Sequence, residues 1–105
     1  MAKTRATIQL NYDAARRQAQ KLDEIARTLT NVADHQLNGS FSQLQSSWKG
    51  DSANAYLNKG KVVQRDIKTT ASNVQNAADS IRKIAKRTYE AELRAIRIAE
   101  MRRTR

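Results

Sequence analysis

The chain has 105 residues, 20 of them Lys or Arg and 10 Asp or Glu, so it is one small domain in size and carries a formal net charge of +10. It has no Cys and one His, His35, which excludes disulfides, thiolate chemistry and zinc sites built on Cys or on several His. The absence of Pro and the presence of only 3 Gly favour few turns and long helices.

The first predicted helix covers about residues 12–46. Asn11 is its predicted N-cap, and Ile8 and Leu10 ahead of it alternate and are expected to be extended. An apolar stripe follows at helical spacing: Ala15, Leu22, Ile25, Leu29 and Val32. Further apolar residues continue across Gly39: Leu37, Phe41, Leu44 and Trp48. We therefore predict that the helix passes through Gly39, and the alternative is a loop over residues 38–51.

A turn is predicted over residues 47–51, where Gly50 can adopt a positive φ and Asp51 or Ser52 can cap the next helix. The first helix would be about 52 Å long at about 1.5 Å per residue. A returning helix of the same length ends near residue 87. Residues 88–105 would then extend beyond the hairpin and end in a frayed basic tail, Met101-Arg102-Arg103-Thr104-Arg105.

The second predicted helix covers about residues 52–98 and carries a heptad pattern. Its members step by threes and fours: Gly60, Val63, Ile67, Thr70, Val74, Ala77, Ile81, Ile84, Thr88, Ala91, Ala95 and Ile98. This period predicts antiparallel packing with a left-handed twist. Four apolar residues flank this seam on the same helix: Val62, Ala71, Ala78 and Ala85.

Two facing helices leave wide apolar flanks in contact with water, so the sequence predicts a partner. The expected fold is an all-α, antiparallel helical hairpin, a single domain over residues 1–105, that dimerises into a four-helix bundle. The predicted dimer seam consists of Leu22, Ile25, Leu29, Val32, Phe41, Leu44, Val63, Ile67, Val74, Ile81 and Ile84.

The turn sequence Trp48-Lys49-Gly50 resembles the WxG motif of the small early-secreted-antigen-like proteins of the type VII (ESX) secretion system. The flanks are similar too, with polar residues before the motif and small residues and Tyr56 after it. Chain length and layout extend this resemblance over nearly the whole sequence. Trp48 would cover the hairpin end as a core residue, contact a partner, or do both.

The resemblance implies a non-enzymatic secretion substrate or partner subunit without catalytic residues, cofactor, metal or small-molecule substrate. Such a chain is exported without a cleavable signal peptide, or stays cytoplasmic until export. The implied partners are an identical chain, a related WxG protein or the helical domain of an effector that it escorts. The secretion ATPase is a further partner, which could read a surface formed by Trp48 and the tail of an antiparallel partner.

The resemblance also implies a C-terminal export signal, a Tyr followed four positions later by an acidic residue. Tyr89 is the tyrosine of the tail, but Leu93 stands four positions later. Glu92 lies three positions after Tyr89, and Ile96 and Glu100 have the spacing without the aromatic ring. The candidate signal is therefore altered, degenerate or supplied by a partner subunit, and the alternative for Tyr89 is a surface tyrosine.

Residues 82–105 hold nine Lys or Arg and three Glu, which raises nucleic acid or an anionic membrane surface as alternative partners. Nucleic-acid binding has little support beyond charge, because Tyr89 is the only aromatic residue in this region and no known binding motif occurs. No run of apolar residues is long enough to cross a bilayer, and no apolar stretch follows the N-terminal charges as in a signal peptide. Catalysis is not indicated, because carboxylates are scattered and His35 and its neighbour Asp34 point apart on a helix.

Overall fold

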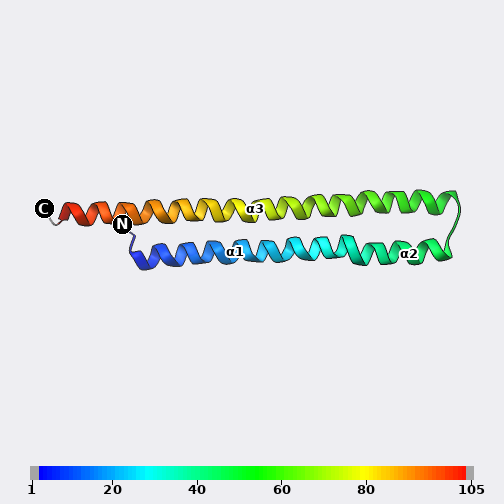
Figure 1. Cartoon of the computed structure of the whole chain (residues 1–105), viewed down its shortest axis with the longest axis horizontal. Coiled ribbons are helices and arrows are strands. Elements are labelled where there is room, and N and C mark those ends of the chain that lie inside the picture. The colour runs from blue at the N-terminus through cyan, green and yellow to red at the C-terminus, as the bar shows by residue number, and fades with distance from the viewer. Residues whose placement is uncertain (1–2, 104–105) are drawn as a thin grey trace. The chain divides into compact units, whose positions relative to one another are not determined.

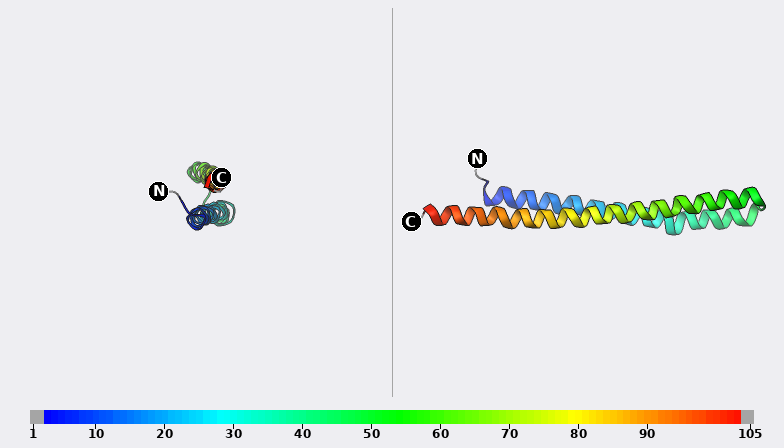
Figure 2. Two further views of the ribbon diagram at one scale, coloured as in Figure 1. Left: turned by 90° about the vertical axis from the view of Figure 1, so that its left-hand side faces the viewer. Right: turned by 90° about the horizontal axis from the view of Figure 1, so that it is seen from above.

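The computed structural model describes residues 3–103, in which all regular structure is helical. Helix α1 spans Arg5–Asn31, the π-helical turn η1 spans Val32–Gln36, α2 spans Leu37–Ser47 and α3 spans Asp51–Arg103 (Figure 1). The chain forms two compact units: unit 1 contains residues 3–22 and 76–103, and unit 2 contains residues 23–75. Within each unit two helical segments lie side by side (Figures 1 and 2). The prediction of an all-α chain is confirmed.

The first helix begins earlier than predicted. Residues 8–11 are helical, so the expectation of an extended segment with an N-cap at Asn11 is wrong. The hydroxyl of Thr4 accepts a hydrogen bond from the backbone N–H of Thr7 at 3.1 Å and so caps the N-terminus of α1. Ile8 is 1% exposed and Leu10 is 65% exposed. In a strand these two side chains would share a face, whereas two positions along a helix they point to different faces.

The predicted overhang of residues 88–105 is wrong in its extent, because part of that stretch lies beside α1. Helix α3 continues to Arg103, and in unit 1 the part of α3 around Tyr89 and Glu92 lies antiparallel to the start of α1, whereas the last turns of α3 extend past that start (Figures 1 and 2). Arg5 contacts Glu100 at 2.8 Å, and the ring of Tyr12 stacks on Tyr89 with centroids 4.4 Å apart. The prediction made this overhang too long because it began the first helix too late, and residues 5–11 cover part of the stretch that was expected to be free. Of the predicted frayed tail, residues 104–105 lie outside the described residues.

The turn η1 adds one residue to the first helical arm of unit 2. The N–H of Leu37 donates to the carbonyl of Val32, five residues earlier. The apolar pattern steps by five between these same two residues, where an α-helix requires three or four. The extra residue keeps the apolar side chains of α2 in line with buried Ala33. The helix passes through Gly39, so the alternative of a loop over residues 38–51 is wrong.

The same turn accounts for a polar residue in the apolar seam of α3. A π-turn frees a backbone carbonyl group, which needs another donor when it is buried. The amide Nε2 of Gln64 donates to the carbonyl of Ala33 and, at 2.7 Å, to Oδ1 of Asn38. Sequence analysis missed this arrangement. Its signals are the five-residue step and a lone Gln in a column otherwise formed by Leu57, Ala71 and Ala78.

The fully buried residues are mostly alanine. They are Ile8, Ala19, Ala26, Ala33, Ala53, Leu57, Ala71 and Ala78. Ala19, Ala26 and Ala33 recur every seven residues, and such small side chains let two helices approach closely. The prediction that Ala71 and Ala78 flank the seam is wrong, because they lie at its centre and bulkier residues border them. Hydrophobicity alone favours large residues for the seam, whereas close packing favours small ones.

Two glycines within helices of unit 2 lead to opposite expectations. A Cβ atom on Gly60 would lie 2.7 Å from Cε1 of Phe41, whereas one on Gly39 would meet nothing within 4 Å. Ala is roughly 1 kcal/mol more favourable than Gly inside an exposed helix, whereas overpacking costs about 1–3 kcal/mol. We expect Gly39→Ala to raise the free energy of unfolding in urea and Gly60→Ala to leave it unchanged or lower it. Adding Phe41→Leu to Gly60→Ala should recover stability; equal gains for both alanine variants would contradict the packing of Phe41 on Gly60.

Candidate functional site

Trp48, Lys49 and Gly50 connect α2 to α3 in unit 2. Trp48 ends α2 in an extended conformation, and its N–H still donates to the carbonyl of Leu44 at 2.8 Å. Gly50 has a φ of +116°, and its carbonyl accepts the N–H of Asn54 at 3.0 Å in the first turn of α3. The chain therefore passes from one helix to the next in three residues, because glycine tolerates a φ that other residues rarely adopt.

The side chain of Trp48 lies beside Tyr56 at this end of unit 2. The ring centroids are 5.7 Å apart and the rings are tilted by 53°. Trp48 is 40% exposed and Tyr56 is 58% exposed. An aromatic pair with this much exposed area presents a large apolar surface with polar atoms at its edge, which suits contact with another protein.

The residues predicted for the dimer seam occupy two environments. Eight are partly buried within their own units: Leu22, Leu29, Val32, Phe41, Leu44, Ile67, Val74 and Ile81. The other three are Ile25 at 49% exposure, Val63 at 54% and Ile84 at 62%. In unit 1, Ile84 belongs to a row of exposed apolar residues at seven-residue intervals, the outer stripe: Ala77, Ile84, Ala91 and Ile98. Neighbouring helix segments therefore cover only part of the apolar surface of α3.

The four residues of the candidate export signal share one face of α3, because they are three or four positions apart. They lie against residues near the start of the chain in unit 1. The hydroxyl of Tyr89 donates to Oε1 of Gln9 at 2.9 Å, and its ring stacks on Tyr12. Glu100 forms an ion pair with Arg5. These side chains are thus part of the helical packing of unit 1.

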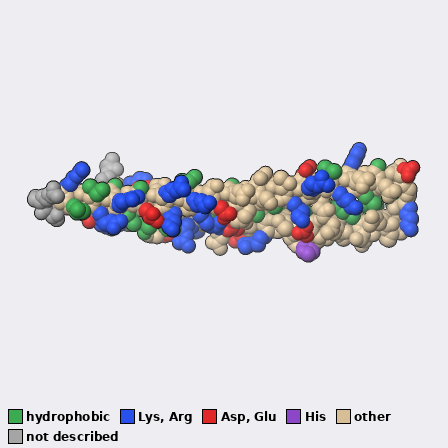
Figure 3. All heavy atoms as spheres, turned by 45° about the horizontal axis from the view of Figure 1, so that its top comes forward, with side chains coloured by type: hydrophobic (Ala, Val, Ile, Leu, Met, Phe, Trp, Pro, Cys, Tyr) green, Lys and Arg blue, Asp and Glu red, His purple; other side chains and the backbone are tan. Residues whose placement is uncertain are grey.

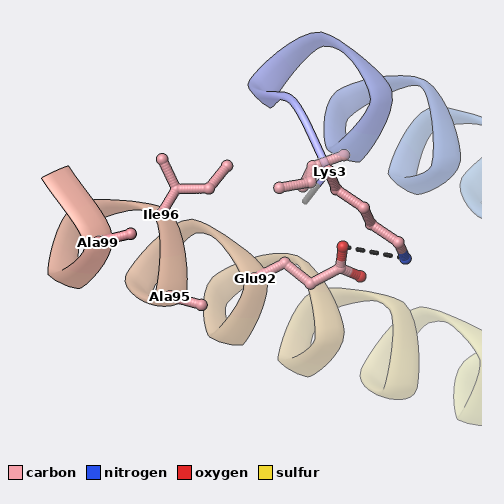
Figure 4. Close-up of a pocket in the computed structure, with 6 residues that line it drawn as sticks. Lys3, Glu92, Ala95, Ile96 and Ala99 are labelled. Carbon is pink, nitrogen blue, oxygen red and sulfur yellow. Dashed lines mark ion pairs between the residues drawn. The ribbon is translucent and has the colours of Figure 1, made fainter. Parts of the chain in front are cut away.

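Glu92 and Ile96, the other two signal candidates, line an open pocket of about 470 Å³ in unit 1. Glu92 contacts Nζ of Lys3 at 3.1 Å on one side of the pocket (Figure 4). Ala95 and Ala99 contribute apolar wall on α3, and Ile8, buried at the start of α1, contributes the opposite wall. The pocket is mostly apolar with one ion pair at its edge.

Charge is distributed unequally between the two units. The described residues of unit 1 hold 13 Lys or Arg and 5 Asp or Glu, a net charge of +8. Unit 2 holds 6 and 5, a net charge of +1. On the face drawn in Figure 3, Lys and Arg side chains are dense along the part of the molecule that belongs to unit 1. The basic character of the chain is therefore a property of unit 1.

Within residues 3–103, no cluster of three or more His, Cys, Asp or Glu side chains could hold a metal ion. No helix among those residues is both long and apolar enough to cross a membrane. His35 is exposed, and its neighbour Asp34 pairs with Lys68 at 2.9 Å. The features with functional potential are thus the connection at Trp48, the face around Tyr89 and the exposed apolar rows.

A family model described as proteins of 100 residues with WXG matches residues 7–92. The chain belongs to the WXG100 family. WXG100 proteins are small helical proteins associated with type VII secretion, are secreted without signal peptides and commonly dimerise with related WXG proteins. No curated protein and no solved structure matches this chain. The match includes Tyr89 and Glu92 and ends before Ile96 and Glu100.

In this WXG100 protein we expect Gly50→Ala to lower the free energy of unfolding by about 1–3 kcal/mol, the cost of holding a residue with a Cβ in a rare backbone region. Nothing lies within 4 Å of the position of that Cβ, so a loss would come from backbone strain and not from a clash. Urea denaturation followed by circular dichroism measures it. Lys49→Ala, one residue away, is the control and should have little effect; equal losses would contradict a specific role for φ at Gly50.

Proposed function

We propose that this WXG100 protein works as a non-enzymatic type VII secretion substrate or partner subunit that pairs with another helical hairpin to form a four-helix bundle. In this proposal residues 1–105 act as one domain. The partner is an identical chain, a related WXG protein or the helical domain of an effector. The chain is exported itself without a cleavable signal peptide, or it escorts the effector after waiting in the cytoplasm.

The observation that carries this proposal is the contrast between a small core and large exposed apolar residues. Six of the eight buried residues between positions 3 and 103 are alanine, whereas Val63 and Ile84 are more than half exposed. Fully burying one such aliphatic side chain contributes about 1.5–3 kcal/mol. Small helical proteins with little core commonly gain the missing stability by association. A second pair of helices would cover these residues and add the core that each unit lacks.

Two further sets of residues are proposed to act in export. Trp48, Lys49 and Gly50 form a compact connection whose tryptophan is 40% exposed, so the ring is accessible to a secretion component such as the ATPase. Tyr89, Glu92, Ile96 and Glu100 are proposed as the remnant of the export signal. Because Tyr89 is stacked on Tyr12, only the exposed part of its ring could be read in the folded chain. This favours a partner subunit that supplies or completes the signal.

We expect Ile84→Asp to weaken assembly strongly, because burying an unpaired carboxylate in an apolar interface costs several kcal/mol. Light scattering after size exclusion should give a lower mass for the variant than for the wild-type assembly; a homodimer would have a mass of about 24 kDa, twice that of the 11.9 kDa chain. If the wild-type chain is monomeric, the same comparison is made with a co-purified partner.

Lys86→Asp is the control, since Lys86 is exposed on the same helix but lies outside the outer stripe. If Ile84→Asp assembled to the same mass as the wild type, the proposal would be contradicted. An excess of absorbance at 260 nm in the protein peak would instead favour the nucleic-acid alternative.

We expect Trp48→Ala to reduce export from cells with a type VII system, because the exposed ring is the proposed contact for a secretion component. Most of the helix content should remain, because Trp48 is not part of the buried core. Export is measured by immunoblotting of culture filtrate against cell lysate, and helix content by circular dichroism of the purified variant. Lys59→Ala, an exposed substitution elsewhere in unit 2, is the control. Normal export of Trp48→Ala would show that the ring is dispensable for recognition.

A further inference from the structure

We propose that the partner covering the outer stripe of unit 1 is an acidic amphipathic helix, whose carboxylates face Arg87 and Arg94. This inference rests on the proposed pairing and adds the chemistry of the partner. It separates an acidic partner protein from three other occupants: a second copy of this chain, nucleic acid and an anionic membrane.

Arg87 and Arg94 lie at one edge of the outer stripe. They follow Ile84 and Ala91 by three positions, which on a helix places each arginine about one turn along and to one side of the apolar residue. Both arginines are exposed, as are the stripe residues beside them. When a helix docks along an apolar stripe, side chains at the edges of the two stripes face each other and select the partner by charge.

The two arginines are free to meet a carboxylate from outside. Within residues 3–103 neither side chain forms an ion pair or a hydrogen bond, although Glu90 lies one turn from both. The other carboxylates in the same part of α3 are engaged: Glu92 contacts Lys3 and Glu100 contacts Arg5. Unit 1 therefore presents an apolar row bordered by two arginines whose side chains are unpaired.

A second copy of this chain fits that surface poorly. Unit 1 of a second copy brings the same net charge of +8, and unit 2 has no excess of carboxylates because its net charge is +1. Like charges at an interface repel, most strongly at low salt. Either orientation of a homodimer thus leaves Arg87 and Arg94 without an excess of negative charge opposite them.

Nucleic acid also fits less well than an acidic helix. Single strands bind to basic surfaces by stacking their bases on exposed aromatic rings. The aromatic rings of unit 1, Tyr12 and Tyr89, are stacked on each other and only partly exposed. The arginines border a row of aliphatic side chains, which a phosphate backbone would leave uncovered and an amphipathic helix would bury.

The test uses three synthetic helical peptides of about 28 residues, four heptads long, with one common apolar seam. Their flanking positions carry Glu, Lys or Gln. Binding to the full-length chain is measured by fluorescence anisotropy at 50 mM and 300 mM salt. We expect the Glu peptide to bind at least tenfold more tightly than the Lys peptide at low salt, with a smaller ratio at high salt.

Charge reversal locates the effect. The Arg87→Glu/Arg94→Glu variant should prefer the Lys peptide. The matched variant Lys86→Glu/Arg103→Glu makes the same change in net charge at exposed positions of α3 outside the stripe and its edge, and it should still prefer the Glu peptide. Circular dichroism of both variants establishes that helix content is unchanged.

Every other result would contradict the inference. Equal binding of the Glu and Lys peptides would leave the apolar pairing intact and overturn the proposal that the partner is acidic. Failure of all three peptides, the Gln peptide included, would count against the apolar pairing itself. Equal loss of Glu-peptide binding in both variants would indicate diffuse electrostatics. Tighter binding of a 20-base-pair DNA duplex or of vesicles containing phosphatidylserine would then identify the competing class. A wild-type dimer that the Glu peptide cannot displace would assign the stripe to a second copy.

Discussion

Close packing of alanine is the constraint on which this structure depends. Ala19 and Ala26 on α1, Ala33 in η1, and Ala71 and Ala78 on α3 are almost completely buried, so the facing backbones in each unit come close together. Close approach buries backbone and small side chains efficiently, but it leaves larger apolar residues at the borders of the contact. Partial burial of Leu22 and Val74 and exposure of Ile84 follow from this geometry.

The register of this packing in unit 2 is maintained by a local defect. The apolar pattern of the first arm contains one residue too many between Val32 and Leu37, and the turn η1 absorbs it. The carbonyl of Ala33 then needs a donor, and the amide of Gln64 supplies it from the facing helix. Turns of this kind are rare and occur mostly as single turns within α-helices. A polar residue in the seam and an irregular helix are thus two parts of one arrangement.

The same packing is consistent with what is common in the WXG100 family, whose members often dimerise with related proteins. Helices that contact each other through small residues leave larger apolar residues exposed, and in the proposed function a second helical hairpin covers them. The concentration of positive charge in unit 1, with Arg87 and Arg94 beside the outer stripe, adds a criterion for the partner beyond hydrophobicity. Fit between apolar rows permits many partners, whereas charge at the edges of those rows discriminates among them.

The amino-acid sequence by itself determined the helical class, the long second helix and the family, because helical periodicity, the scarcity of Gly and Pro and the Trp48-Lys49-Gly50 motif are properties of local sequence. It did not determine which of two adjacent apolar rows on α3 faces the other arm. That choice depends on how closely two backbones can approach, which favoured Ala71 and Ala78 over Val63 and Ile84. It also did not place the start of α1 or the partners of residues 89–100, because contacts such as those of Arg5 with Glu100 join residues far apart in the chain. Local spacing carries no information on such contacts, and only the tertiary structure decided them.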